Sequence, residues 1–202
     1  MCRLFETIRV ENGKPLHLGW HQQRMEKACK EFWPGSQQQE LENLLKVPSE
    51  FSTGIVRCNI SYGEEIEDIR YTYYSRRSIR SLKLVYCDTI DYHVKYLDRT
   101  ILGKLMDMRG ECDDILIVKD GLITDTSMSN IIFYNGTTWV TPDKPLLKGT
   151  CRERLLEEGM IATSDICADD LHLFTGCKLI NAMRFPEEEE MIRVPQIDCK
   201  PE

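Results

Sequence analysis

The sequence predicts an α+β, multidomain protein with two α/β portions of unequal size, each built on a mixed or antiparallel sheet. Short segments rich in branched and aromatic residues, typical of strands, outnumber the helical patterns. Two pairs of these segments are joined by Lys119-Asp120-Gly121 and Asn135-Gly136, turn sequences that favour hairpins. The β-α-β alternation of a doubly wound sheet is absent. We place the break near residues 76–92, which predicts a smaller domain at 1–80 and a larger domain at 81–202.

The smaller domain should contain two helices. The first, at 18–32, is favoured because Met25 and Cys29 are spaced for one buried face. Ser36 is a suitable N-cap for the second helix, whose apolar side would come from leucines within 41–45. The strands predicted for this domain lie at 4–10, 53–62 and 69–75.

The larger domain should contain most of the strands, because its patterns are mainly short and rich in branched residues. They are predicted at 82–87, 114–118, 122–124, 130–134, 138–140 and 178–184. Helices are predicted at 100–109, 149–158 and 168–174. The acidic run at 187–190 is most simply a solvated surface.

Composition excludes several kinds of partner. The net charge of −7 argues against a general attraction to nucleic acid or anionic membrane, and no apolar run is long enough to cross a bilayer. The nine cysteines are not closely paired, and without an export signal they are expected to be reduced thiols. Phosphate-loop, dinucleotide-binding and zinc-binding patterns are absent. We therefore expect a cytoplasmic protein with no metal, nucleic-acid or membrane partner.

The segment HVKYLDR, residues 93–99, places Lys95 among apolar neighbours. An apolar setting disfavours the ammonium form and lowers the pKa of a lysine, as Schiff-base chemistry requires. The alternative is a surface lysine that extends its amine into water. From this segment alone, the surface lysine is the simpler interpretation.

Two further segments carry candidate site residues. Gly149 and Thr150 lie at the start of a predicted helix, where backbone N–H groups and the helix dipole favour an anion. Asp125 and Asn130 lie in a polar patch between two predicted strands. An ordinary helix start and an ordinary loop would explain the same residues, so neither segment identifies a site by itself.

Several segments, taken in order along the chain, resemble the class IV aminotransferases. They are LFETIRV with HQQRM, then KYLDR, DDILIVKDGLITDTSMSNIIFYNGTTWVTP and LLKGTCRERLLE, and the resemblance extends from Leu4 to about residue 186. These are pyridoxal 5'-phosphate (PLP) enzymes of fold type IV, with the D-amino acid aminotransferase-like fold. They include branched-chain and D-amino acid aminotransferases and aminodeoxychorismate lyase. The resemblance implies this fold and this cofactor.

The resemblance also assigns roles to individual residues. Lys95 matches the Schiff-base lysine that transfers the substrate proton, and Asp125 matches the acid, usually glutamate, that faces the pyridine nitrogen. Asn130 matches the asparagine that follows this acid and helps to order the loop. The larger domain would then carry both the Schiff-base lysine and the phosphate-binding helix start. The residues matched to phosphate binding are Arg24, Gly149, Thr150, Cys151 and Asn181.

Three departures from the family pattern concern the same site. Asp125 is one methylene shorter than glutamate, and Cys151 replaces a common threonine, which removes a hydroxyl from the phosphate site. The chain also begins at the strand that contains Leu4, so we expect an N-terminally shortened form of the fold. Because Lys95, Arg24 and the helix start are retained, PLP is still expected to bind.

Two local features favour the lyase within this family. Thr7 stands where branched-chain aminotransferases usually have glycine, and its hydroxyl would assist proton transfer; alternatively, it only packs in a strand. KYLDR is similar to the lyase pattern Lys-x-Leu-Asn-Arg. Arg9 is a candidate for holding a substrate carboxylate, with a surface strand position as the alternative.

We therefore expect an aminodeoxychorismate lyase-like enzyme, which would convert 4-amino-4-deoxychorismate to 4-aminobenzoate and pyruvate for folate synthesis. One alternative is a class IV aminotransferase for branched-chain or D-amino acids. Another is a degenerate, non-catalytic homologue that binds PLP or a partner. The resemblance also implies a small-molecule substrate and a homodimer, with the site between the two domains.

Overall fold

The computed structural model describes residues 2–36 and 39–198, which form two compact units. Unit 1 comprises the described residues up to Arg76 together with Val94–Asp98, and unit 2 comprises Arg77–His93 together with the described residues from Arg99 onward. These units contain both mixed and antiparallel sheets, which confirms the predicted fold class. Among the described helices, none combines the length and the apolar character that crossing a bilayer requires.

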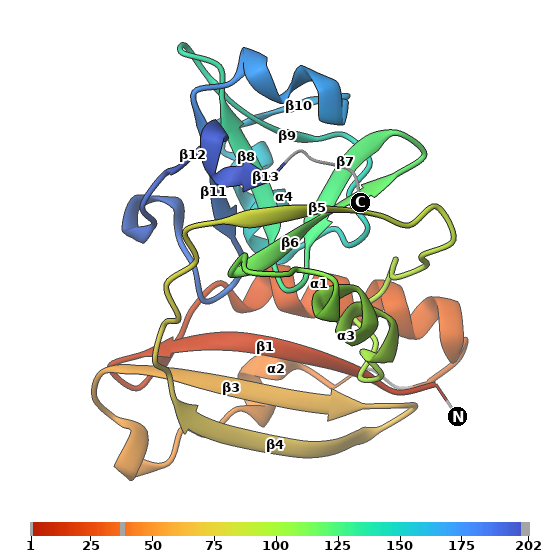
Figure 1. The fold of residues 1–202 in the computed structure, drawn as a ribbon. Coiled ribbons are helices and arrows are strands. Elements are labelled where there is room, and N and C mark those ends of the chain that lie inside the picture. Colours follow the sequence, from red (N-terminus) through yellow and green to blue (C-terminus); the bar gives the residue numbers. More distant parts are fainter. Residues whose placement is uncertain (1, 37–38, 199–202) are drawn as a thin grey trace. The chain divides into compact units, whose positions relative to one another are not determined.

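Unit 1 is built on one antiparallel sheet (Figure 1). Its strands are β1 (Leu4–Glu11), β2 (Lys14–Pro15), β3 (Ile55–Tyr62) and β4 (Ile66–Tyr73), in the spatial order β2-β1-β3-β4. Its helices are α1 (Leu18–Phe32), α2 (Leu41–Leu44) and the short 3-10 helix η1 (Ser49–Phe51). Strands β1 and β3 pair from Leu4 opposite Tyr62 to Glu11 opposite Ile55. The edge of β1 that faces β3 is therefore paired along the whole strand.

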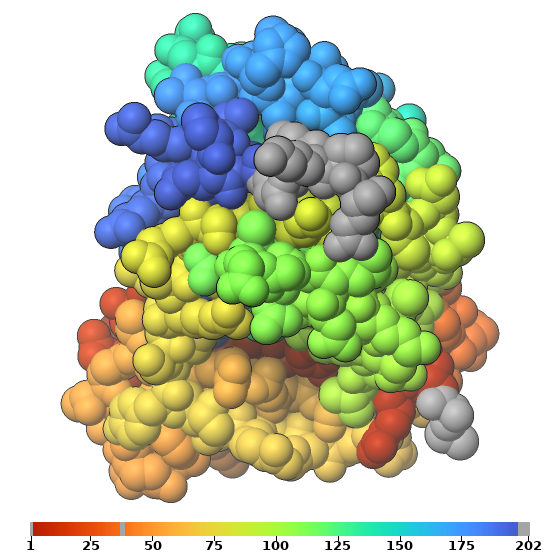
Figure 2. All heavy atoms as spheres, in the orientation of Figure 1, coloured from red at the N-terminus to blue at the C-terminus, as the bar shows by residue number. Residues whose placement is uncertain are grey.

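The core of unit 1 lies between this sheet and α1. Leu4 and Ile8 of β1 are fully buried and share one hydrophobic cluster with Met25 and Cys29 of α1. The helix bounds predicted from the spacing of Met25 and Cys29 are confirmed. Strand β4 lies at one edge of the sheet, and its residues, yellow-orange in the space-filling view, are exposed or half-buried (Figure 2).

The segment that carries Lys95 belongs to unit 1. The N–H of Phe5 donates to the carbonyl of Lys95 at 3.0 Å, and the N–H of Leu97 donates to the carbonyl of Arg3 at 2.8 Å. Residues 95–97 therefore extend the sheet alongside the start of β1, although they lie about 90 residues further along the chain. This differs from the expected division, which placed Lys95 with the larger domain, and the backbone pairing with β1 is the physical reason.

Unit 2 contains two sheets that share one hydrophobic core. The first has the order β13-β5-β6-β7 and comprises β5 (Leu82–Tyr86), β6 (Asp114–Lys119), β7 (Leu122–Thr126) and β13 (Ile197–Asp198). The second has the order β10-β9-β8-β11-β12 and comprises β8 (Asn130–Tyr134), β9 (Trp139–Pro142), β10 (Ala162–Ser164), β11 (Gly176–Ile180) and β12 (Ile192–Arg193). The helices are α3 (Thr100–Asp107) and α4 (Thr150–Glu157), with the 3-10 helices η2 (Ala168–Leu173), η3 (Pro186–Glu188) and η4 (Val194–Gln196). Strands β5 and β6 are parallel, whereas the hairpins β6–β7 and β8–β9 are antiparallel, as predicted.

Three predicted elements are corrected by the structure. The helix expected after Ser36 is limited to α2, with Glu40 as its N-cap, and part of the predicted span, residues 37–38, lies outside the described residues. The helix expected at 168–174 is the 3-10 helix η2. The strand expected at 178–184 ends earlier, at Ile180, because the backbones of Asn181 and Arg184 bond each other across a tight turn.

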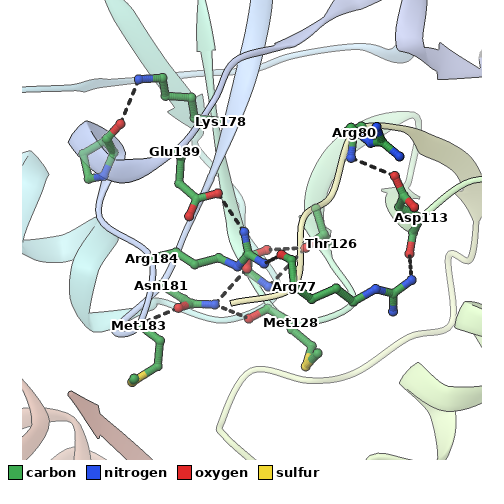
Figure 3. A network of polar contacts seen from close by, with 12 residues as sticks. Arg77, Arg80, Asp113, Thr126, Met128, Lys178, Asn181, Met183, Arg184 and Glu189 are labelled. Carbon is green, nitrogen blue, oxygen red and sulfur yellow. Dashed lines mark hydrogen bonds and ion pairs between the residues drawn. The ribbon is translucent and has the colours of Figure 1, made fainter. Parts of the chain in front are cut away.

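The acidic run at 187–190 is not simply a solvated surface. Glu189 Oε2 lies 2.7 Å from Arg184 Nη1, and each side chain is only 9% exposed. Arg184 also donates to the backbone carbonyl of Arg77 (Figure 3). The turn after β11 is therefore tied to the segment that enters β5, and Glu189 neutralises the buried guanidinium that makes the connection.

Candidate active site

Strand β1 and helix α1 bring three charged or titratable side chains together inside unit 1. Glu6 is fully buried, and its neighbours on the same strand face, Leu4 and Ile8, are core residues. Arg24 Nε donates to Glu6 Oε1 at 2.9 Å, and Arg24 Nη2 donates to Glu6 Oε2 at 2.5 Å. His21, three residues earlier on α1, donates from Nδ1 to the same Oε2 at 2.6 Å.

The carboxylate of Glu6 is strongly held in its ionised form. Burial alone would raise its pKa, but the charge of Arg24 and the hydrogen bond from His21 outweigh burial and lower the pKa to about 2. Burial lowers the pKa of His21, which is therefore neutral at neutral pH. An ionised carboxylate can only accept, so the proton of His21 must be on Nδ1.

Thr7 lies on β1, Lys95 lies in the segment beside this strand, and each side chain has a defined neighbour. Lys95 Nζ lies 4.6 Å from the centroid of the Phe5 ring, a cation–π distance, and Lys95 is partly buried rather than fully exposed. Thr7 Oγ1 accepts a hydrogen bond from Asn59 Nδ2 of β3 at 3.0 Å. The Thr7 hydroxyl thus has a fixed position on the strand next to the segment of Lys95.

Arg9 is not a surface strand residue. It is 2% exposed, and its Nη2 lies 3.0 Å from Glu11 Oε2. Glu11 is two residues further along β1 and therefore on the same face of the strand. The alternative that placed Arg9 at the surface is therefore wrong. A buried, partnered arginine remains compatible with binding an anion, because the guanidinium has five donors.

In unit 2, Asp125 and Asn130 form a clamp with the backbone of Leu147. Asn130 Nδ2 donates both to Asp125 Oδ1 at 2.7 Å and to the carbonyl of Leu147 at 2.8 Å. The N–H of Leu147 donates to Asp125 Oδ2 at 2.8 Å. Asp125 is the next-to-last residue of β7 and Asn130 begins β8, so the clamp joins this strand connection to the segment that leads into α4.

Glycine is required at position 149 because the Asn130 side chain approaches its Cα closely, and not because of an unusual backbone conformation. Its φ of −71° is accessible to any residue, but a Cβ at this position would lie 2.1 Å from Asn130 Oδ1. Gly149 is the N-cap of α4, and Thr150 and Cys151 are its first residues, all of them buried. The first N–H groups of this helix have no partner within the helix, so they are suited to an anion.

The charge of Asp125 is set by a different environment from that of Glu6. Burial raises the pKa of Asp125 to about 6, against the lowering effects of the Leu147 N–H, the Asn130 amide and the charge of Arg152. Arg152 is 3% exposed and donates to the carbonyl of Pro142 at 2.8 Å. Asp125 is therefore a buried carboxylate whose hydrogen bonds come from neutral groups, and a cationic partner would stabilise its ionised form.

Asn181 and Cys151, both predicted to bind the phosphate, differ in their hydrogen bonding and charge. Asn181 Nδ2 donates to Ser129 Oγ at 2.9 Å and to the carbonyl of Met128 at 3.3 Å, which ties the turn after β11 to the turn between β7 and β8 (Figure 3). Burial raises the pKa of the Cys151 thiol to about 11, so it stays neutral at neutral pH. Asn181 thus orders the turn that follows Asp125, and Cys151 adds no charge to the start of α4.

The predicted site residues fall into two groups, one in each unit. Unit 1 contains Thr7, Arg9, Arg24 and Lys95, and unit 2 contains Asp125, Asn130, Gly149, Thr150, Cys151 and Asn181. Sequence reasoning missed Glu6 and His21, although a signal was present. Glu6 interrupts the otherwise apolar face of a strand, and His21 and Arg24 are spaced for one helix face. Arg152 was also missed, and the alternating charges of its segment give no indication that it is buried.

Comparison with known proteins is consistent over nearly the whole chain. The family model for Amino-transferase class IV matches residues 92–186. An uncharacterized protein from Haemophilus influenzae is 42% identical over 185 residues, covering 91% of this chain and 98% of its own length. The crystal structure of a putative 4-amino-4-deoxychorismate lyase from Haemophilus somnus is similar with a TM-score of 0.87 at 38% identity, covering 92% of this chain and 98% of that chain.

A more distant structure extends the likeness in fold. The PLP-bound form of a hypothetical aminotransferase from Mycobacterium tuberculosis has a TM-score of 0.73 at 16% identity, covering 98% of this chain and 81% of that chain. At this identity the comparison concerns the fold alone. The family model and the relatives at 38% and 42% identity lead to one conclusion: the chain belongs to the class IV aminotransferase family.

Proposed function

We propose that this chain is a PLP-dependent lyase that converts 4-amino-4-deoxychorismate into 4-aminobenzoate and pyruvate. The observation that carries the proposal is the buried carboxylate of Asp125, whose hydrogen bonds come from Asn130 and the backbone of Leu147. A protonated pyridine nitrogen is the partner that such a carboxylate stabilises. The choice of substrate is supported by the 38% identity to a putative lyase of this specificity.

The donors present in the chain fit this cofactor. A phosphate ester requires a cation and N–H groups, which Arg24 and the start of α4 would supply. The pyridine nitrogen would meet Asp125, and Lys95 would supply the amine for the cofactor's aldehyde. Once bound, the cofactor supplies an electron-accepting ring that stabilises negative charge on the substrate carbon next to the amine.

The remaining tasks concern proton transfer and substrate binding. Lys95 Nζ would take the proton from the substrate carbon that carries the amine. Thr7 Oγ1 is held by Asn59, so its own O–H can be directed at the substrate and would assist proton transfer as pyruvate departs. Arg9, whose Nη2 pairs with Glu11, would hold a substrate carboxylate, since a guanidinium can bind a carboxylate in a two-point contact.

The test is the release of pyruvate and 4-aminobenzoate from 4-amino-4-deoxychorismate by the PLP-loaded protein. We expect equal amounts of both products from the wild type and none from Lys95→Ala. Lys104→Ala is the matched control, because Lys104 lies exposed on α3, and it should behave as the wild type. Release that persists in Lys95→Ala would contradict the role of this lysine.

Two other outcomes would identify the alternatives. A wild type that takes up PLP but releases no pyruvate would overturn the lyase. Amino-acid and 2-oxo-acid pairs should then be tested for amino transfer. A wild type that is colourless after unbound PLP has been removed would overturn cofactor-dependent catalysis and favour a non-catalytic homologue.

A further inference from the structure

The buried pair between Glu6 and Arg24 constrains how Arg24 can act. Glu6 accepts from both Nε and Nη2 of Arg24, which fixes the plane of the guanidinium. The Arg24 side chain is 16% exposed, whereas Glu6 is not exposed at all. The pair therefore has one end in the core and the other towards the surface of α1. The two contacts with Glu6 occupy Nε and one hydrogen of Nη2.

His21 completes the arrangement around Glu6. It is 1% exposed and donates to Glu6 Oε2, the oxygen that also accepts from Arg24 Nη2. Three donors thus converge on the two oxygens of one buried carboxylate. Only an acceptor on both oxygens satisfies them, so the position requires a carboxylate and not an amide.

We propose that Glu6 is a positioning residue for cofactor binding, which acts through Arg24 by holding the guanidinium in the orientation that meets the phosphate of PLP, with His21 as its second support. This inference rests on the proposed function. A long arginine side chain loses considerable rotamer freedom when it binds a ligand. The pair with Glu6 restricts the rotamers of Arg24 before the phosphate binds. Less conformational entropy is therefore lost when PLP binds.

Substitution of Glu6 by glutamine tests this role with little change in volume. The amide would place an NH2 group against Arg24 or His21, so the two-point contact with Arg24 would be lost. We expect Glu6→Gln to raise the Kd for PLP about fivefold to tenfold, the cost of ordering one long side chain. The Kd for pyridoxal, which lacks the phosphate, should change less than twofold.

A double variant separates positioning from a general structural effect. Arg24→Met should raise the Kd for PLP about 10- to 100-fold, because a charged hydrogen bond to the phosphate is lost. If Glu6 acts through Arg24, then Glu6→Gln combined with Arg24→Met should bind PLP no more weakly than Arg24→Met alone. Losses that multiply in the double variant would overturn the inference.

Other outcomes would also overturn it. If Glu6 only reduced the positive charge of Arg24, Glu6→Gln would bind PLP as tightly as the wild type or more tightly. Equal weakening for PLP and pyridoxal would indicate a structural role. Should Glu6→Gln not fold, His21→Leu decides the matter. This variant removes one donor to Glu6, and its Kd for PLP should rise about threefold with pyridoxal unchanged, since one supporting hydrogen bond is lost; no change would count against the inference.

The same titrations distinguish this inference from the proposed function. A wild type that binds PLP but releases no pyruvate would defeat the lyase proposal and leave the role of Glu6 standing. If the wild type binds PLP and the Glu6 and His21 variants bind it with the same affinity, only the role of Glu6 is defeated. A wild type that binds no PLP would defeat both.

Discussion

Glu6 in unit 1 and Asp125 in unit 2 are both buried carboxylates, but their surroundings differ. Glu6 is paired with the guanidinium of Arg24, and its pKa is lowered to about 2. Asp125 accepts from the amide of Asn130 and the N–H of Leu147, and burial raises its pKa to about 6. Burial is common to both carboxylates. The direction of the pKa shift is therefore decided by whether a cationic group is hydrogen-bonded directly to the carboxylate.

The difference indicates what each carboxylate can do. The negative charge of Glu6 is balanced by Arg24 within the fold, so its contribution is structural or positional. The charge of Asp125 is costly without a cationic partner, and such a partner would be bound more tightly for that reason. A carboxylate held by neutral dipoles is therefore the better candidate for binding a cation than one that already has a guanidinium.

The largest effect is expected from Glu6→Ala. It would leave Arg24 and His21 facing a cavity with no acceptor, which for a broken buried ion pair costs about 3–5 kcal/mol of unfolding free energy. The loss should be measured by urea denaturation at pH 7. Because the folded pKa is depressed, the contribution of Glu6 is present above its ordinary pKa and is lost as pH falls towards 2.

A matched control for this variant is Glu42→Ala, an exposed glutamate on α2. Its effect should be within about 0.5 kcal/mol of the wild type. A similarly small loss in Glu6→Ala would show that the pair contributes little net energy. It would then remove the distinction between a balanced and an unbalanced buried carboxylate.

Asp125 should show the opposite dependence on acid. Its folded pKa is raised, so the unfolded chain releases this proton at lower pH, and stability falls as pH rises from about 4 to 6. A rise in the pKa of Asp125 from its ordinary value to about 6 is equivalent to about 3 kcal/mol across that window. The difference in unfolding free energy between the cofactor-free wild type and Asp125→Asn should change by that amount between pH 4 and 6.5.

Asparagine at position 125 cannot accept from both Asn130 and the Leu147 N–H, so Asp125→Asn will also lower stability at every pH. The slope, not the absolute value, therefore carries the test. A difference that stays constant between pH 4 and 6.5 would mean that Asp125 titrates normally. The contrast with Glu6 would then disappear.

Most of the fold was predictable because local patterns agree with the tertiary structure. The bounds of α1 and the two hairpins of unit 2 followed from apolar spacing and turn residues. The placement of Lys95 was not predictable, since it depends on a backbone pairing with β1 across about 90 residues of sequence. The 3-10 helix η2 and the early end of β11 depend on local turns, which apolar periodicity does not detect.

The candidate site was predictable as a set of residues but not as a set of contacts. Asp125, Asn130 and Gly149 were identified by resemblance, yet nothing in the sequence indicates that Leu147 links them. Glu6 was overlooked because a single acid in a strand is usually exposed. The alternation of β1 places it on the buried face, and an ion pair is the usual way to keep a charge there.

Gly149→Ala tests whether the clamp around Asp125 is as tight as the structure shows. The new Cβ would lie 2.1 Å from Asn130 Oδ1, so Asn130 or the start of α4 must move, at a cost of about 1–3 kcal/mol. Gly103→Ala is the control, because a Cβ there would meet nothing within 4 Å apart from its chain neighbours and the backbone of its own helix, and it should stabilise α3 by up to about 1 kcal/mol. Equal effects of the two variants in urea denaturation would show that the clamp is loose, and Asp125 would then lack the fixed dipoles that distinguish it from Glu6.

The smallest effect is expected from Asn181→Ala, which isolates the turn after Asp125 from the carboxylate itself. The variant removes the hydrogen bond to Ser129 Oγ and the acceptor of the Met183 N–H, at a cost of about 1–2 kcal/mol. Because Asn181 is neutral and does not contact Asp125 among the contacts described, the pH dependence between 4 and 6.5 should keep the slope of the wild type. Asn43→Ala, an exposed asparagine on α2, should change neither quantity appreciably. A changed slope in Asn181→Ala would show that the pKa of Asp125 depends on the order of the neighbouring turn, so its direct partners alone would not account for the contrast with Glu6.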